Sequence, residues 1–403
     1  MSGYDVVVVG GRVAGASTAL LLARAGARVA VVERGGPDRD TVSTHALMRA
    51  GVLQLARWGV LDRVVAAGTP PVRHTVFGYP DGERVGVSIR GTHGVEALYA
   101  PRRTLLDRLL LDLAEEAGAE VHRRTDVVGL TRATGGRLTG VLTRGRSGDA
   151  ELSADLVVGA DGLRSTVARD VGAETVRRGR AASAVLYRYL RGFDVTGYEW
   201  LYGDRAAAGL IPTNDEATCV FVSTTPVRMR QLLRGGREEA FTRLLRASAP
   251  GLDELVGGAT DRSRMRGWRG AAGLVRRSAG PGWALVGDAG YYKDPISAHG
   301  ITDALRDAEL LADAILASTA GGHEGRHAMA AYQETRDRLS HSLWHATEEV
   351  AGYAWDAPRA RTLMRAVSAS MSDEVDHLSR LPLRTGSAPG TRTPARVGAT
   401  SVA

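Results

Sequence analysis

The sequence predicts an α/β fold: a Rossmann-like domain interleaved with a second domain built on a β-sheet, followed by C-terminal helices. The first observation is a strand–turn–helix–strand order over residues 4–33, which implies parallel strands. The second is a pair of further apolar strands, at 154–160 and 282–286, which each lead into a turn containing Asp and Gly. The third is an aromatic, strand-like stretch at 182–225 between them.

The N-terminal unit has the most regular pattern. Residues 4–9 and 28–33 are apolar, β-branched runs typical of strands buried on both faces, and the Ala- and Leu-rich stretch 16–25 predicts a helix between them. The turn at 10–15 keeps the first and third glycines of a dinucleotide-binding turn, Gly10 and Gly15, but has Arg12 in place of the middle one. The helix start would offer free N–H groups to a pyrophosphate. A βαβ unit that binds no nucleotide is the alternative reading of this segment.

Residues 44–180 predict alternating helices and short strands. Residues 44–68 have a helical pattern interrupted near Gly59, and 73–89 alternate around the turn signal Pro80-Asp81-Gly82, which predicts a hairpin. An amphipathic helix is expected at 103–118, with leucines on one side. Short strands are expected within 120–131 and at 138–143 and 154–160.

The remaining half predicts a sheet and then helices. The strand-like stretch carries several aromatic residues: Tyr187, Tyr189, Phe193, Tyr198, Trp200 and Tyr202. A helix is expected at 300–317 and two more within 327–371, whereas the Gly-, Pro- and Ser-rich end is expected to be disordered. The predicted division assigns 1–72, 101–180 and 273–320 to the Rossmann-like domain, 73–100 and 181–272 to the sheet domain, 321–381 to C-terminal helices and 382–403 to the tail.

Composition narrows the classes of protein. A length of 403 residues suits two joined domains, and the net charge of +7 is spread along the chain without a basic block interleaved with aromatics, so no nucleic-acid partner is expected. The single cysteine, Cys219, excludes an internal disulfide and is expected to be a small core residue of a cytoplasmic protein. The N-terminal valine run is too short to span a membrane. A monomer or homodimer is expected.

Two further turns carry chemistry. Asp161, in Gly159-Ala160-Asp161-Gly162, ends a buried strand, where an acid is either a helix cap or a ligand contact. The longer turn runs from Gly287-Asp288 through Asp294-Pro295 to Thr302 and opens a new helix. Asp288 is placed to hydrogen-bond a flavin's ribityl chain, and the amides of the helix start would face the flavin edge where negative charge gathers on reduction.

In this order and spacing, the three turns resemble the glutathione-reductase-type FAD fold of single-component (group A) flavoprotein monooxygenases, the para-hydroxybenzoate hydroxylase class, and the related geranylgeranyl reductases. The resemblance covers residues 4–345. It implies adenosine ribose on Glu33, 18 residues past Gly15 (33 − 15), and pyrophosphate near the first turn. The FAD contacts that it implies are Gly10, Gly11, Arg12, Ala14, Gly15, Glu33, Arg34, Arg49, Arg103, Asp161, Asp288, Pro295, His299, Gly300, Ile301 and Thr302.

Three positions depart from the family pattern: Arg12 and Ala298 stand where glycine is usual, and Thr302 stands where asparagine is common. These departures affect the details of the site more than the assignment to the family, because the polar contacts of the flavin are largely made by backbone. Three side chains are candidates for catalysis: His299, Lys293 and His45. A structural histidine at 45, a backbone-only role at 299 and an exposed loop lysine at 293 are the alternatives. No metal-ligand cluster stands out.

The resemblance implies an FAD-dependent monooxygenase that uses NADPH or NADH and O2, through a C4a-hydroperoxyflavin, to oxygenate an aromatic or lipophilic small molecule. The only dinucleotide turn is the first one, so the nicotinamide is expected to bind transiently over the flavin. One alternative is a geranylgeranyl reductase-like enzyme that reduces C=C bonds, although Gly209-Leu210-Ile211-Pro212 lacks that family's tryptophan. A non-catalytic flavin-binding protein is another. A halogenase is disfavoured because its Trp-x-Trp-x-Ile-Pro signature is absent from the sequence.

Overall fold

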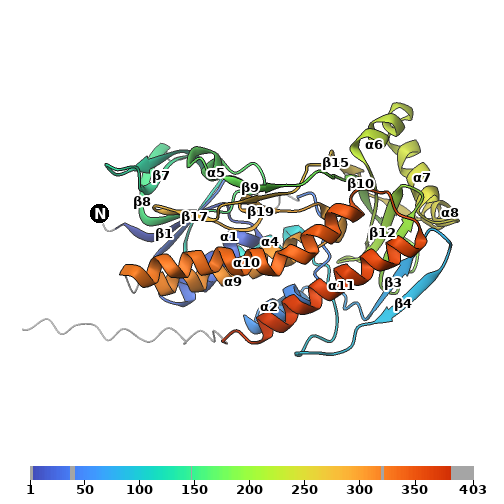
Figure 1. The fold of residues 1–403 in the computed structure, drawn as a ribbon, viewed down its shortest axis with the longest axis horizontal. Coiled ribbons are helices and arrows are strands. Elements are labelled where there is room, and N and C mark those ends of the chain that lie inside the picture. The colour runs from blue at the N-terminus through green and yellow to red at the C-terminus, as the bar shows by residue number, and fades with distance from the viewer. Residues whose placement is uncertain (1–2, 37–40, 147, 319–321, 383–403) are drawn as a thin grey trace, which may run out of the picture.

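The computed structural model describes residues 3–36, 41–146, 148–318 and 322–382. This part of the chain forms two lobes, each centred on a sheet of eight strands (Figure 1). Two long helices, α10 (Gly322–Val350) and α11 (Ala357–Ser379), run along the molecule from one lobe to the other. The α/β architecture with C-terminal helices is therefore confirmed.

The first sheet contains the predicted βαβ unit. β1 (Tyr4–Val9) pairs in parallel with β2 (Val29–Glu33) and with β8 (Gly148–Gly159), and α1 (Val13–Arg24) connects β1 to β2. The strand order is β17-β18-β8-β1-β2-β5, with β5 at Glu120–Arg123, β17 at Ala279–Gly280 and β18 at Trp283–Leu285. β6 (Asp126–Arg132) and β7 (Leu138–Gly145) extend it as an antiparallel pair beside β8. The carboxyl ends of β1, β2, β8 and β18 consequently meet at one edge, where ligands of open α/β sheets bind.

Helices cover this sheet. α1 packs against α4 (Arg103–Glu116) and α9 (Gly300–Ser318), and α10 packs on the far side of α9. Apolar side chains from these helices and from β1 and β2 form one continuous core. α5 (Thr166–Asp170) follows β8. A small sheet with the strand order β19-β16-β9 lies between the lobes, formed by β9 (Thr175–Arg178), β16 (Leu274–Arg276) and β19 (Tyr291–Tyr292).

The second sheet has the order β14-β10-β13-β12-β11-β3-β4, with β15 also beside β10. Its strands are β3 (His74–Gly78), β4 (Arg84–Ser88), β10 (Ala184–Arg191), β11 (Tyr198–Gly203), β12 (Ala206–Pro212), β13 (Thr218–Thr224), β14 (Asp261–Arg262) and β15 (Arg266–Trp268). The predicted hairpin forms β3 and β4 and joins this sheet through a parallel pairing with β11. One face packs against α6 (Pro226–Leu232), α7 (Arg237–Ser248) and α8 (Leu252–Gly257).

Several predicted boundaries were wrong. Residues 44–48 are not helical, and the helices there are α2 (Arg49–Arg57) and α3 (Leu61–Ala66), separated by Gly59 at φ 69°. α1 begins three residues before the predicted start (16 − 13) because the helix starts within the predicted turn at 10–15, with Gly15 in its first turn. α11 continues to Ser379, beyond the predicted end at 371, since Val375 and Leu378 of its last turns are buried.

Residues 383–403, most of the predicted tail, lie outside the described residues. Within the described ranges, no helix combines the length and apolar character needed to cross a membrane. Cys219 is fully buried in β13, as predicted.

Candidate active site

The three predicted turns meet at the carboxyl edge of the first sheet. A Cβ atom added to Gly10, which has φ 104°, would lie 2.6 Å from the carbonyl oxygen of Ala160, and one on Gly15 would lie 1.8 Å from the carbonyl oxygen of Gly10. A Cβ on Gly287 would lie 2.8 Å from the Cβ of Ala14. The first turn therefore touches the second through backbone at Gly10 and the third through the Cβ of Ala14 at Gly287, and a side chain at any of these three glycines would clash.

Glu33 is fixed against the first turn. Its carboxylate accepts hydrogen bonds from the backbone N–H of Gly11 (2.7 Å) and of Gly35 (2.5 Å). Arg12 is the N-cap residue of α1 in an extended conformation, and Arg34 is exposed. The carboxylate of Glu33 therefore lies beside the start of α1, where a dinucleotide-binding fold places the acid that binds a ribose.

The side chain of Asp161 helps Ser165, the N-cap residue, to cap α5, and one of its carboxylate oxygens is left over. Its Oδ2 atom accepts hydrogen bonds from the N–H of Thr166 (2.6 Å) and Val167 (3.4 Å) at the start of α5. Its Oδ1 atom is buried and has no hydrogen-bond partner within the described part of the chain. The capping alternative is therefore realised, and the second oxygen is the one that a ligand could use.

Asp288 lies on the short turn after β18 and is exposed to solvent. Desolvation by the neighbouring protein raises the pKa of its carboxyl to about 6, against the opposing positive charges of Arg103 and Lys293. Arg103 itself pairs with Asp107 one turn along α4 at 2.8 Å. Two residues predicted to contact one cofactor, Arg103 and Asp288, thus lie close enough to influence each other's charge.

The longest turn ends in an accessible helix start. Pro295–Ser297 form one 3-10 turn, Ala298 adopts φ 48°, and α9 begins at the exposed Gly300. The left-handed conformation of Ala298 costs roughly 1 kcal/mol relative to glycine, which accounts for the glycine usual there. A Cβ on Gly300 would meet nothing within 4 Å. The free N–H groups and positive dipole end of a 19-residue helix therefore face open space.

Thr302 has a structural role. It is buried, and its hydroxyl accepts a hydrogen bond of 3.2 Å from the N–H of Met48, the N-cap residue of α2. Its side chain thereby ties α9 to α2. Arg49, which follows Met48 in the chain, directs its guanidinium to the hydroxyl of Thr92.

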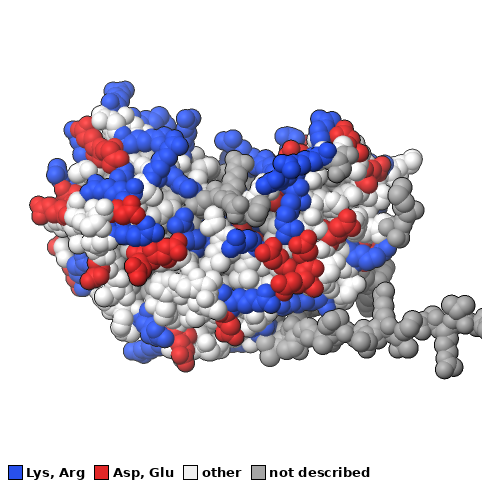
Figure 2. All heavy atoms as spheres, turned by 180° about the vertical axis from the view of Figure 1, so that it is seen from behind, with Lys and Arg blue, Asp and Glu red and all other residues white. Residues whose placement is uncertain are grey.

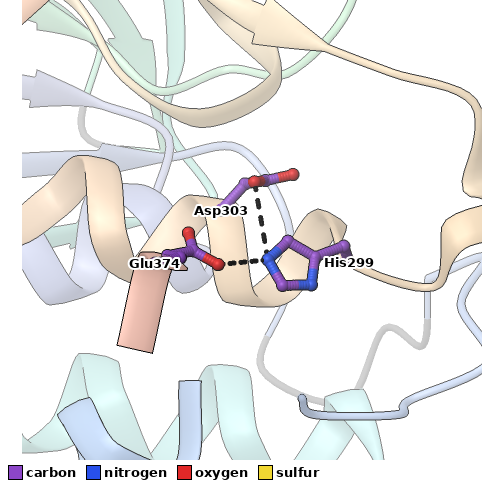
Figure 3. A group of neighbouring side chains, drawn as sticks. All are labelled: His299, Asp303 and Glu374. Atoms are coloured by element: carbon purple, nitrogen blue, oxygen red, sulfur yellow. Dashed lines mark hydrogen bonds and ion pairs between the residues drawn. The ribbon is translucent and has the colours of Figure 1, made fainter. Parts of the chain in front are cut away.

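His299 and Lys293 belong to a buried charge network beneath this helix start. Figure 3 shows three of its members, His299, Asp303 and Glu374. The Nε2 atom of His299 lies 2.5 Å from Oε2 of Glu374 on α11. Arg306 donates to Asp303 and to Glu374, both at 3.0 Å, and to Asp307 at 2.6 Å. Lys293 donates to Asp303. The predicted alternative of an exposed lysine was wrong.

The network fixes the protonation of its members. Burial lowers the pKa of His299, so the imidazole is neutral, with its proton on Nε2 facing the carboxylate. Burial alone would raise the pKa of Glu374, but His299 and Arg306 hold that pKa below its ordinary value. The Nδ1 atom of His299 is buried without a hydrogen-bond partner among the described residues. His299 is therefore a neutral base held in one tautomer.

His299, Asp303 and Glu374 are also the one cluster in the described ranges whose His, Asp or Glu ligand atoms all lie within 4.8 Å of one another. A metal does not fit there, because Arg306 lies 3.0 Å from both carboxylates and Lys293 pairs with Asp303. A further cation would face two cations already paired with these acids. The cluster is an ion-pair network.

His45 is structural and connects the lobes. It is fully buried at φ 67°; its Nδ1 accepts a hydrogen bond of 3.2 Å from the N–H of Arg103, so Nε2–H donates to the hydroxyl of Tyr189. Burial and the charges of Arg102, Arg103 and Arg266 hold its pKa well below 6.5. It remains neutral and cannot act as a cationic acid.

Aromatic side chains line the second sheet where it meets the long turn. Tyr187, Trp200 and Phe221 share one buried apolar cluster with Ile296 of that turn, and Ala298 packs against the same cluster. Its other predicted aromatic members are Tyr189, Tyr198 and Tyr202. Phe193 packs on the opposite face, with the α7 cluster, and so was wrongly grouped with them.

Sequence reasoning missed Glu374, Arg306 and Tyr189 as partners of the predicted residues. Arg306 and Asp307 stand next to each other on α9, and buried charged residues within a helix that is otherwise apolar were a usable signal. Glu374 gave none, because it lies 75 residues from His299 on a helix with many charges.

Comparisons with known proteins agree with this geometry. Residues 3–347 match the family described as FAD binding domain. The 6-methylpretetramide 4-monooxygenase of Streptomyces rimosus is 31% identical over 75% of this chain and 73% of its own length. The digeranylgeranylglycerophospholipid reductase of Methanothrix thermoacetophila is 26% identical over 82% of each chain. The fold of P. aeruginosa PqsL, determined in complex with 2-aminobenzoylacetate, superposes with a TM-score of 0.78 at 24% identity, covering 90% of this chain and 100% of that one.

Proposed function

The chain belongs to the FAD binding domain family, and from that premise we propose that it is an NAD(P)H-dependent monooxygenase that oxygenates an aromatic or lipophilic small molecule. The observation that carries the proposal is the apolar cluster in which Tyr187, Trp200 and Phe221 meet Ile296 of the long turn. An apolar aromatic wall beside the flavin turn suits an aromatic substrate and excludes water, which flavin-dependent oxygenation requires.

The residues of the three turns fit FAD. Gly10 allows the tight turn and Gly15 the close packing of the helix on that turn, which together place the start of α1 for a pyrophosphate, and Glu33 is positioned for the ribose. Asp288 offers an accessible carboxylate for the ribityl hydroxyls, and the open start of α9 at Gly300 offers N–H groups to the ring's electron-rich edge. When bound, FAD supplies acceptance of hydride from NADPH or NADH and activation of oxygen.

The residues of the chain stabilise the charge that develops in the reaction and hold the flavin turn in place. The start of α9 stabilises negative charge through its dipole, and neutral His299 adds no charge of its own. The network of Lys293, Arg306 and Glu374 holds the turn and the helix start in place. No side chain is required as a nucleophile, since the proposed reaction uses the cofactor's reactivity.

Reduction of a C=C bond is the second candidate. It is favoured by the similarity to a digeranylgeranylglycerophospholipid reductase over 82% of this chain, and the apolar cluster would also suit a polyprenyl chain. The two reactions differ in their use of oxygen, because only the first consumes O2 in proportion to product.

The test is to follow NAD(P)H oxidation, O2 uptake and product formation by the FAD-loaded protein with a panel of aromatic and polyprenyl compounds. A monooxygenase gives O2 uptake equal to product and no product under anaerobic conditions. Anaerobic turnover of a polyprenyl compound would establish the reductase instead. A yellow protein whose FAD is bleached by neither NADPH nor NADH would contradict both and support a non-catalytic flavin-binding protein.

A further inference from the structure

The buried network beneath the start of α9 carries an uncompensated negative charge. Charged side chains of both signs are dispersed over the face of the molecule shown in Figure 2, whereas the members of this network are each 6% exposed or less. They are two bases and three acids with a formal sum of −1 (2 − 3): Lys293, Arg306, Asp303, Asp307 and Glu374. Burial lowers the pKa of Lys293 to about 7, so at higher pH the sum becomes more negative. An unbalanced buried charge is unfavourable, and uptake of a proton by the network would remove it.

The elements around the network do not cancel this charge. Its titratable neighbours include one group on each of four elements: Asp288 on the turn, Tyr291 on β19, Tyr332 on α10 and His377 on α11. Burial raises the pKa of both tyrosines, which stay uncharged, and lowers that of His377, which is neutral at pH 7. Above its pKa of about 6, the carboxyl of Asp288 adds further negative charge.

The arginines on the neighbouring helices are engaged elsewhere. Arg336 on α10 lies over the ring of Tyr291 and pairs with Asp337 at 2.5 Å. On α2, Arg57 pairs with Glu309 at 3.4 Å, and Arg49 is directed to Thr92. The only charged residue of α1 is Arg24, in its last turn. The charges that act most strongly on His299 are those of Glu374, Lys293 and Arg306.

His299 offers the network a place for one proton. Its Nε2 atom lies 2.5 Å from Glu374 and 4.0 Å from Asp303 (Figure 3). Its Nδ1 atom is buried and has no hydrogen-bond partner among the residues that the structure describes. Burial lowers the pKa of the imidazole and keeps it neutral, whereas the carboxylate of Glu374 favours the charged form. A proton on Nδ1 would make the formal sum of the network zero (3 − 3).

His299 is also close to the proposed flavin contact. It directly precedes Gly300, the exposed first residue of α9. Because consecutive Cα atoms are about 3.8 Å apart, the imidazole lies within about 10 Å of the N–H groups at the helix start. Two-electron reduction of a flavin leaves negative charge at the edge that would face this helix start. At an effective dielectric constant of about 20, a unit negative charge about 10 Å away raises the proton affinity of a base roughly tenfold.

We propose that His299 takes up a proton on Nδ1 when the bound flavin is reduced and releases it when the flavin is reoxidised. One proton joins the flavin together with the two electrons, and a second proton, taken from water, forms the Nδ1–H bond. Reoxidation reverses both steps. The network thereby loses its negative charge when the flavin gains one, which stabilises the reduced flavin. The inference rests on FAD binding at the start of α9 and applies to both reactions considered above.

The test is the pH dependence of the two-electron midpoint potential of the full-length, FAD-loaded protein, measured anaerobically between pH 7 and pH 9. Dithionite supplies the electrons and is oxidised to sulfite, and a dye of known potential reports the equilibrium. Each proton taken up with two electrons lowers the potential by about 30 mV per tenfold fall in proton concentration. We expect a slope of about 60 mV per pH unit over part of this range for wild type, and about 30 mV throughout for His299→Gln.

Three further variants separate a titrating histidine from a structural one. Glu374→Gln keeps the imidazole but makes the network's formal sum zero (2 − 2), so it should also give about 30 mV per pH unit. Lys293→Arg keeps a cation that does not lose its proton, and His341→Gln removes an exposed histidine of α10; both should keep the wild-type slope. A purely structural role of His299 would change the potential or weaken FAD binding without changing the slope.

Two results would overturn the inference: a wild-type slope of about 30 mV per pH unit throughout, or equal slopes for wild type and His299→Gln. If the steeper slope survives in His299→Gln but is lost in Lys293→Arg, the proton is taken up by Lys293 instead. If it survives in both, the second proton resides on the flavin. None of these results bears on the proposed function, because dithionite replaces NAD(P)H and no substrate is present.

Discussion

Gly300 offers a substitution that separates cofactor binding from folding. It begins α9 and is exposed, and a Cβ atom there would meet nothing within 4 Å. Its φ is not in the left-handed region, so a side chain can be accommodated by the backbone. If FAD lies against this helix start, a side chain at residue 300 would collide with the cofactor and with nothing else.

The expected effects have opposite signs. Gly300→Ala should stabilise the FAD-free protein by about 0.4–1 kcal/mol, because the substitution reduces the conformational freedom of the unfolded chain at a compatible position. The same methyl group should weaken FAD binding about tenfold, or by about 1.4 kcal/mol, and Gly300→Val should weaken it further. Thermal unfolding of the FAD-free protein and titration of flavin fluorescence measure the two quantities separately.

Gly257 is the matched control. It lies in α8 of the other lobe, is exposed, has an ordinary φ and also has nothing within 4 Å of an added Cβ. Gly257→Ala should leave FAD binding unchanged. If Gly300→Val binds FAD as tightly as wild type while folding normally, the cofactor does not contact the start of α9, and the assignment of the long turn fails.

Three further predictions concern other parts of the site. Asp288→Ala should lose most of its FAD. In wild type, the affinity for FAD should be constant above pH 6 and fall about tenfold per pH unit below it, because protonation of a carboxyl with pKa about 6 competes with binding. Asp288→Asn should abolish this pH dependence in flavin titrations. Glu374→Gln should lower the free energy of unfolding of the FAD-loaded protein by about 2–3 kcal/mol in denaturant titrations, because Arg306 and His299 lose a buried anionic partner. The control Asp376→Asn, at an exposed position of the same helix, should change it by less than about 0.5 kcal/mol. His45→Ala should keep its FAD but lose about 1–3 kcal/mol of stability, since the Tyr189 hydroxyl and an Arg103 N–H lose a buried partner; a colourless purified variant would contradict this structural role.

The backbone of the site was predictable from sequence, because its geometry depends on local signals. Gly10, Gly15 and Gly287 mark positions where no side chain fits; Gly10 and Gly287 come just after apolar strands, and Gly15 lies in the first turn of α1. Strands that run parallel in one sheet must end at one edge, so the three turns had to converge once the strands were identified. The fold and the position of the site followed from those few residues.

Side-chain partners were not predictable in the same way. Thr302 was expected to face the flavin, but its hydroxyl bonds the N–H of Met48, 254 residues earlier in the chain. Arg49 was expected to face the pyrophosphate, and its guanidinium is directed to Thr92. Both partners depend on tertiary packing, of α2 against α9 for Thr302 and of the segment after β4 against α2 for Arg49. A sequence pattern of period two or 3.6 carries no information on such packing.

The C-terminal helices are better regarded as part of the site than as an addition to it. Apart from neutral His299, the members of the network on α9 or the turn before it are two bases and two acids with a formal sum of zero (2 − 2): Lys293, Arg306, Asp303 and Asp307. Glu374 on α11 supplies the acceptor that fixes the tautomer of His299 and, after Asp303 and Asp307, the third acid that holds Arg306. Without α11 the imidazole would lose its orientation and Arg306 would keep a buried donor unsatisfied. The conformation of the flavin turn therefore depends on a helix 75 residues further along the chain.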